Sequence, residues 1–403
     1  MSLIQDIATD EMALIEELKR RYINEITPKM REDDTLWHRF LKARDFNLKD
    51  AEDLLKKHIQ FRKEFRIDHI LEEWQPCEVL AKYCPMKNIG FDKEGHPIVY
   101  IDMAADTKGL VSSVKRADFI RFGCWRIEQS IEMMKMKSKE TGKNIYQVIF
   151  VANFDGMTFA QATSKKALEL FLLAVTVFQD NFPERIKSVY VINGSIYFSM
   201  VWSVVKQFLA PAIINKFIIF GTDKWKDALL NVIDPEELPA FIGGKKTDPD
   251  GNPRCNTIVI HAGTVPEKFY MKKSDRKLYL SPGVKRLTVT RFAKAELTFD
   301  VTIPNSYLEW EFETKNKDIG FGVFFRPSSV NKSKAQEIVP KQRIDTCFGP
   351  ETGVYRCEKP GTYILLFDNS YSWFYPKEIF YKTKIVLPKD DGSEALEPMA
   401  TEN

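Results

Sequence analysis

Residue types that carry covalent chemistry are present in this sequence, but not at the spacings that such chemistry needs. Gly194-Ser195 follows a predicted strand without forming the GxSxG turn of a serine hydrolase. Residues 243–246, Gly-Gly-Lys-Lys, lack the upstream glycine and the Ser or Thr of a phosphate-binding loop, and no GxGxxG is present. Asp155-Gly156 after a strand is typical of a turn. We therefore expect a protein that is not an enzyme.

Metal-binding and disulfide-forming residues are equally scattered. The five histidines stand at 38, 58, 69, 96 and 261, with no HExxH or comparable ligand spacing. The six cysteines stand at 77, 84, 124, 255, 347 and 357, with no CxxC pair. This pattern favours free thiols in a reducing cytosol over a disulfide framework or a zinc site. We expect no metal and no cofactor.

Composition excludes several broad classes of protein. The chain has 403 residues, of which 44% are hydrophobic and 12% aromatic, too many for disorder over most of its length. Its net charge of +3 argues against a strongly basic nucleic-acid binder. The most apolar run, residues 167–178, is shorter than a membrane span, and the N-terminus has no secretory signal pattern. These features predict a soluble, cytoplasmic, multidomain protein.

Apolar periodicity divides the sequence into five segments. Residues 1–75 are predicted to form a small helical lobe, and residues 76–246 alternate β-rich runs with helical stretches, which indicates a mainly parallel sheet. Residues 247–284 are predicted to be a basic linker. The apolar period then becomes two, which predicts an antiparallel β-sandwich over 285–389, and a polar tail covers 390–403. The predicted fold is an α/β domain followed by an all-β domain.

One helical segment, residues 196–209, is unusually apolar. Ten of its fourteen residues are hydrophobic, which leaves almost no polar face. One interpretation is a core helix packed between layers. The other is a helix with one face on the body of the protein and another on a lipid-filled cavity or a membrane. The large apolar side chains concerned are Phe198, Val201, Trp202, Val205, Phe208 and Leu209.

Several short motifs make the sequence recognisable. Residues 36–46 read LWHRFLKARDF, residues 181–187 read NFPERIK before a strand, and residues 235–244 contain LP followed by GG. Together these resemble the CRAL-TRIO (Sec-fourteen-like) family of lipid-binding domains. Alternating strands with GFGV at 320–323 and LFDNSYS at 366–372 resemble the GOLD (Golgi dynamics) domain. The order CRAL-TRIO and then GOLD covers nearly the whole chain.

The resemblance implies a binding site. Members of the family hold one hydrophobic molecule in a cavity above the sheet, closed by a mobile gate helix that the segment 196–209 matches. Phosphoinositide-binding members use charged residues outside the gate, and Glu184, Lys216 and Arg44 stand at matching positions. An alternative is that Glu184 and Arg44 form an ion pair that ties the helical lobe to the sheet.

The function that these observations predict is binding and transfer of a lipid between membranes. The resemblance implies tocopherol, squalene or a phospholipid such as phosphatidylinositol as the ligand. The basic stretch 245–294 could hold the protein transiently at an anionic membrane, or it could only solubilise the linker. The alternative function is a lipid-regulated trafficking adaptor whose GOLD domain binds a protein partner. No nucleic-acid partner is expected.

Overall fold

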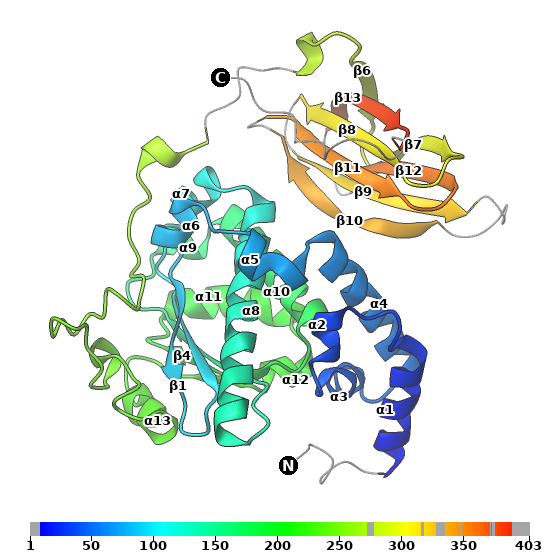
Figure 1. Ribbon diagram of the computed structural model, residues 1–403. Coiled ribbons are helices and arrows are strands. Elements are labelled where there is room, and N and C mark those ends of the chain that lie inside the picture. Colours follow the sequence, from blue (N-terminus) through cyan, green and yellow to red (C-terminus); the bar gives the residue numbers. More distant parts are fainter. Residues whose placement is uncertain are drawn as a thin grey trace. The chain divides into compact units, whose positions relative to one another are not determined.

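A computed structural model describes residues 9–271, 278–315, 318–327, 335–346, 349–370, 372 and 375–388. The chain divides into two compact units, Met1–Tyr270 and Met271–Asn403 (Figure 1). The predicted tail, 390–403, lies outside the described residues. Each unit has its own hydrophobic core and is described by itself.

The first unit begins with a helical lobe. Its helices are α1 (Thr9–Tyr22), α2 (Pro28–Arg31), α3 (Leu36–Lys42) and α4 (Leu48–Glu64). The α2 and α4 helices have side-chain N-caps, since Thr27 accepts a hydrogen bond from the Met30 amide and Asn47 accepts one from the Asp50 amide. The apolar faces of α1, α3 and α4 meet in a separate core around Phe40.

An α/β domain follows the lobe. Its five-stranded sheet has the order β1-β2-β3-β4-β5, in which β1 is antiparallel to β2 and the other pairings are parallel. The strands are β1 (Met86–Phe91), β2 (Pro97–Asp102), β3 (Val148–Asn153), β4 (Ile186–Ile192) and β5 (Phe217–Ile219). The helices are α5 (Ile70–Glu73), α6 (Glu78–Tyr83), α7 (Thr107–Ser113), α8 (Arg116–Thr141), α9 (Phe159–Ala162), α10 (Lys165–Asn181), α11 (Ile196–Val205), α12 (Pro211–Ile214) and α13 (Trp225–Val232).

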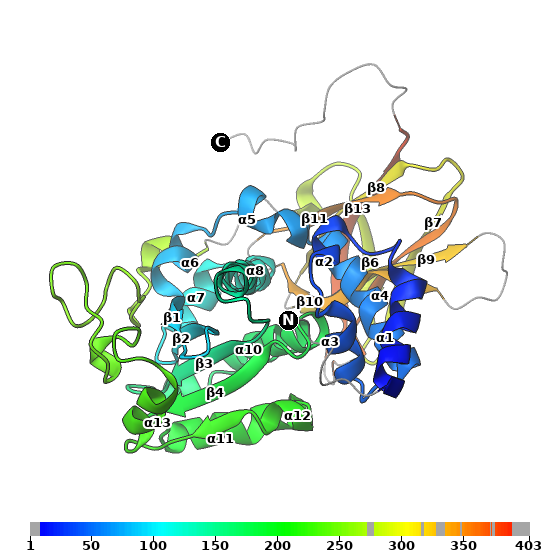
Figure 2. The same cartoon turned by 60° about the horizontal axis from the view of Figure 1, so that its bottom comes forward.

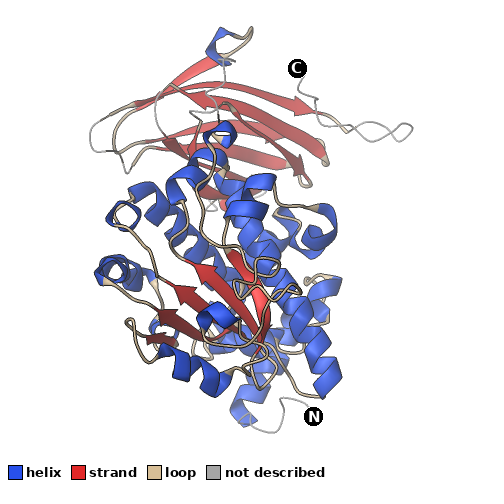
Figure 3. Ribbon diagram, turned by 90° about the vertical axis from the view of Figure 1, so that its left-hand side faces the viewer, coloured by secondary structure: helices blue, strands red, loops and turns tan. Residues whose placement is uncertain are grey.

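Both faces of this sheet are covered, as Figure 3 shows. On β3, Phe150 and Ala152 pack into the core on the side of α8 and α10, whereas Ile149 and Val151 pack against α13 on the other side. Burial on two sides explains why the central strands are almost continuously apolar. The mainly parallel α/β sheet predicted from the sequence is confirmed.

The segment predicted as a basic linker, 247–284, begins within the first unit. Cys255 and Val259 are buried in the core beside α13, and Val265 is buried in a core beneath α6 and α7. Asp106 accepts a hydrogen bond from the Val265 amide at 3.0 Å. Residues 247–270 therefore form a strap that packs on the α/β domain.

The second unit is the predicted antiparallel β-sandwich. Two four-stranded sheets have the orders β10-β9-β12-β7 and β11-β8-β13-β6, and their inner faces form one aromatic-rich core. The strands are β6 (Lys285–Val289), β7 (Lys294–Val301), β8 (Ser306–Thr314), β9 (Asp318–Pro327), β10 (Gln336–Asp345), β11 (Glu351–Cys357), β12 (Gly361–Asp368) and β13 (Lys377–Val386). Phe312, Phe321 and Phe367 lie within 5.3 Å of one another by ring centroids.

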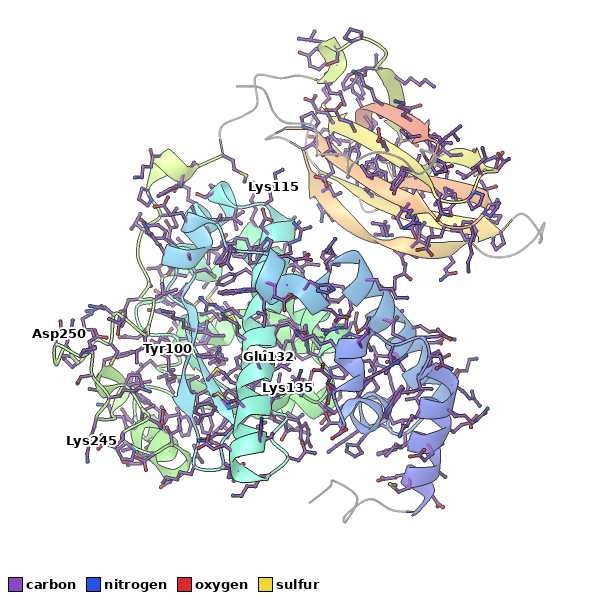
Figure 4. The ribbon with its side chains drawn as sticks, in the orientation of Figure 1. Tyr100, Lys115, Glu132, Lys135, Lys245 and Asp250 are labelled. Carbon is purple, nitrogen blue, oxygen red and sulfur yellow. The ribbon has the colours of Figure 1, made fainter. Side chains whose placement is uncertain are left out.

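Buried charges join the helical lobe to the α/β domain. One carboxylate oxygen of Asp33 lies 2.5 Å from Arg39 Nη2 and 2.5 Å from Arg185 Nη2, and Arg39 also donates to the Pro183 carbonyl at 2.8 Å. Burial alone would raise the pKa of Asp33, but the two guanidinium groups outweigh it and hold the pKa below its ordinary value. On the neighbouring α8, Lys135, labelled in Figure 4, donates to Glu32 at 2.9 Å.

Replacing Asp33 by Asn should leave two buried guanidinium groups without a counter-charge. We expect a loss of about 3–5 kcal/mol in the free energy of unfolding, measured by denaturant titration. Because the folded-state pKa of Asp33 is lowered, its contribution is present above pH ~4 and is lost as the pH falls further, and Asp33→Asn should remove this acid dependence. The control Glu32→Gln, at a carboxylate that is 63% exposed, should change stability by about 0.5 kcal/mol at most. Equal losses in the two variants would contradict the proposed anchoring.

Truncation tests the strap. A fragment of residues 1–275 should fold without the sandwich, because the first unit has its own cores. A fragment of residues 1–246 loses the buried side chains of Val259 and Val265, each worth about 1.5–3 kcal/mol, and should melt at a markedly lower temperature. Thermal unfolding of both fragments measures this. Equal melting temperatures would mean that the strap is a passive connection.

Candidate functional site

The α/β domain contains a cavity of about 400 Å³. One wall is the sheet face that carries Phe150, Ala152 and Val191, and the other walls come from α8, α10 and the segment that includes α11. Figure 2 shows α11 and α12 following one another along one side of the domain. This volume lies within the range of ordinary small-molecule sites.

The lining of the cavity is almost entirely hydrocarbon. Its thiols, Cys84 and Cys124, have pKa values raised to about 12 by burial, so both remain protonated and pack as apolar groups. The Asp102 carboxylate at the edge already accepts hydrogen bonds from the Ala104 and Ala262 amides at 3.0 Å each. A polar molecule would lose its hydration here without compensation, whereas a hydrocarbon would not.

Residues 196–209, which we call the gate segment, form a wall of this cavity. Ser195 caps α11 by accepting a hydrogen bond from the Tyr197 amide, and a 3-10 turn, Lys206–Phe208, continues the helix. Five of the six side chains predicted for the site line the cavity: Phe198, Val201, Trp202, Val205 and Leu209.

The two faces of the gate segment differ in their contacts. The rings of Trp202 and Phe217 lie 4.6 Å apart, and those of Phe198 and Phe154 lie 4.8 Å apart, so α11 is packed on the sheet. Phe208, the sixth predicted side chain, does not line the cavity and is 54% exposed. Ile196, 73% exposed, and Met200 also point outward. The gate segment thus has one apolar face on the cavity and several apolar side chains on its outer surface.

The contribution of α8 and α10 to the cavity was not predicted from the sequence. Leu170, Phe171, Ala174 and Phe178 of α10 line the cavity opposite the sheet. The available signal was the run 167–178, the most apolar stretch of the sequence. Its single charge, Glu169, is compatible with a helix that is polar on one side only.

The residues predicted for headgroup binding are only partly brought together. Lys216 Nζ lies 3.1 Å from Glu184 Oε2, and Glu184 adopts a left-handed backbone with φ 56°. Arg44 donates to the Ala43 carbonyl at 2.8 Å, and in the described part of the chain it forms no ion pair with Glu184. The connection between lobe and sheet is made by Asp33, Arg39 and Arg185.

One group of potential metal ligands occurs among the described residues. Asp92, Glu94 and His96 have ligand atoms within 4.8 Å of one another. The Lys187 ammonium lies 2.7 Å from a carboxylate oxygen of Asp92 and 2.7 Å from one of Glu94. Burial lowers the pKa of His96. Because Lys187 already pairs with both carboxylates, this arrangement favours an ion-pair network over a cation site.

The fold and the cavity define a class of protein: a helical lobe followed by a mainly parallel sheet that forms the floor of an apolar cavity. Residues 85–244 match the family model of the CRAL/TRIO domain, and this part of the chain is similar to that domain. The solved structure of Sfh5 covers 66% of this chain and 95% of its own, with a TM-score of 0.50 and 16% identity, which supports the fold alone.

Relatives extend the similarity beyond this domain. Protein ctg-1 of Caenorhabditis elegans is 29% identical over 92% of this chain and 96% of its own length. Protein real-time of Aedes aegypti is 27% identical over 73% of this chain, which spans 46% of that relative. Within the described residues, no helix is both long and apolar enough to cross a bilayer.

A charge placed on either side of α11 should distinguish its two faces. Val205→Asp puts a carboxylate into the cavity wall, where ionisation next to hydrocarbon is costly, and should abolish lipid retention. Ser203→Asp, two residues away on the exposed face, should retain lipid as the native protein does. Lipid extraction with mass spectrometry, alongside thermal unfolding, measures both effects. Equal lipid loss in the two variants would contradict the assignment of the faces.

Proposed function

We propose that this protein binds a hydrophobic lipid in the cavity and transfers it between membranes through the cytosol. The observation that carries the proposal is the hydrocarbon lining of the cavity. Exposing one methylene group to water costs ~0.8 kcal/mol, so a sixteen-carbon chain crosses an aqueous barrier of roughly 13 kcal/mol. A cavity with this lining removes most of that barrier.

The scarcity of polar lining groups favours an uncharged ligand. Apart from Asp102, whose two oxygens are occupied by backbone amides, Thr107, Gln179 and the indole of Trp202 are the side chains with oxygen or nitrogen atoms among the lining residues. An isoprenoid such as tocopherol or squalene leaves few buried polar atoms unsatisfied there. Phosphatidylinositol is the second candidate, with its headgroup at Lys216 and Glu184.

Exchange of the ligand requires contact with a membrane. The outer surface of the gate segment presents Ile196, Met200 and Phe208 to solvent, and Lys206 lies among them. Apolar side chains of this kind gain free energy on entering the interface of a bilayer, and a lysine adds attraction to anionic lipids. We infer that the gate segment opens at the membrane surface.

Transfer between vesicles tests the function and the ligand class together. Purified protein should move labelled tocopherol or squalene from donor to acceptor vesicles without any partner. If phosphatidylinositol is also carried, Lys216→Ala should weaken its transfer by roughly ten- to a hundredfold, since a charge-assisted hydrogen bond is lost, and should leave isoprenoid transfer unchanged. Lys187→Ala, which removes a lysine paired with Asp92 and Glu94, serves as the control.

The outcomes separate the candidate functions. If the protein transfers none of these lipids and its β-sandwich captures one protein in a lipid-dependent way, the function is that of an adaptor and not of a carrier. Equal loss of both lipids in Lys216→Ala would assign Lys216 a structural role. No transfer and no retained lipid would overturn the proposal.

A further inference from the structure

The gate segment ends at a break in its helix. The 3-10 turn finishes at Phe208, Leu209 and Ala210 are extended with ψ of 138° and 143°, and α12 begins at Pro211. At such a break the last carbonyl groups of one helix and the first amide groups of the next lack partners within their own helices. An unpaired backbone group is costly where water is excluded, so the partners of this break determine how firmly it is held.

Gln179 of α10 provides those partners. Its Nε2 atom donates to the Phe208 carbonyl oxygen at 3.1 Å, and its Oε1 atom accepts from the Ala210 amide at 3.0 Å. One side-chain amide thus bonds the backbone on both sides of Leu209, in the donor-and-acceptor pattern of a paired strand. Gln179 also lines the cavity, and so does Leu209.

These two hydrogen bonds are different in kind from the other contacts of the gate segment. Its inward side chains pack on apolar neighbours such as Phe217, and those contacts are non-directional. Hydrogen bonds need one geometry and break when the backbone moves by an ångström or two. They therefore stabilise one position of the break specifically.

We propose that Gln179 is a latch that holds the gate segment against α10 and sets the rate at which the cavity exchanges its lipid. The proposal rests on the proposed function. Gln179 is a positioning residue, because it acts on the backbone of the gate segment. Both bonds are accessible to water, so each stabilises the latched position modestly. Loss of both should raise the release rate roughly five- to thirtyfold.

The latch needs both the donor and the acceptor of the Gln179 amide, and substitutions can remove them. Gln179→Met keeps the length and most of the volume of the side chain but removes the donor and the acceptor. Gln179→Glu keeps an acceptor for the Ala210 amide but turns a carboxylate oxygen toward the Phe208 carbonyl, which is repulsive. A matched control is available in Thr176 of α10, which does not line the cavity and whose Oγ1 donates to the Leu172 carbonyl within its own helix at 2.9 Å.

The experiment uses the full chain loaded with diphenylhexatriene, a hydrocarbon whose fluorescence depends on an apolar environment. Release into excess phosphatidylcholine–phosphatidylserine vesicles is followed by stopped flow. Gln179→Met and Gln179→Glu should release the probe five- to thirtyfold faster, with unchanged stoichiometry and a melting temperature within a few degrees of the native value. Thr176→Val, which removes an exposed hydrogen bond of α10 outside the gate segment, should release it at the native rate.

Amide hydrogen exchange over residues 206–212, measured without any ligand, provides an independent readout. The Ala210 amide should exchange faster in Gln179→Met than in the native protein and in Thr176→Val. Native release rates in both Gln179 variants, or unchanged protection of this segment, would overturn the latch while leaving lipid binding intact. Failure of the native protein to take up the probe would instead count against the proposed function, and the exchange measurement would still decide the latch.

Discussion

This structure depends on one constraint: the helices and strands around the hydrocarbon-lined cavity must hold its walls apart. Apolar side chains close-pack wherever their backbones allow, so the walls must be held by directional interactions elsewhere. The sheet provides them on one side through its ladder of hydrogen bonds. Near the lobe, Arg62 pairs with Glu128 of α8 at 2.9 Å, and Asp33 pairs with two arginines. These ion pairs lie outside the cavity, whose lining is almost entirely hydrocarbon.

This separation also gives the domain a floor and a cover of different construction. The floor strands are buried on both faces, and their backbone groups are paired along their length. The gate segment and the adjoining Ala210 contain a short helix, a 3-10 turn and an extended break. Local stability follows the density of buried contacts and paired backbone groups, so motion is expected to concentrate in the cover.

Much of the fold was predictable from the sequence because it is recorded in local patterns. Two-sided burial of β3 and β4 appears as continuous apolar runs, and the sandwich appears as a period of two. The β1 strand was missed because only Ile89 of its residues is buried. The strap was missed because its apolar signal is short: Cys255 stands among polar residues, and Ile258-Val259-Ile260 is a run of only three apolar residues.

The site residues could be predicted from the sequence only where they belong to one helix. Five inward residues of the gate segment follow from its composition, but Phe208 lies beyond the change from α-helix to 3-10 turn, which a single helical period does not anticipate. Asp33 and Arg185 are 152 positions apart, and no local pattern pairs them. Their proximity depends on how the lobe docks.

The strap affects where recombination can cut this domain out as a working unit. It follows residues 85–244 in the sequence, yet it supplies buried side chains to two of the cores beneath them. A recombination event that copied the domain and stopped at residue 244 would deliver a sheet with an uncovered apolar surface, prone to aggregation. Selection would remove such recombinant proteins, whereas a crossover after residue 270 would transfer a module that folds by itself. The unit that evolution can shuffle is thus longer than the unit that sequence similarity outlines.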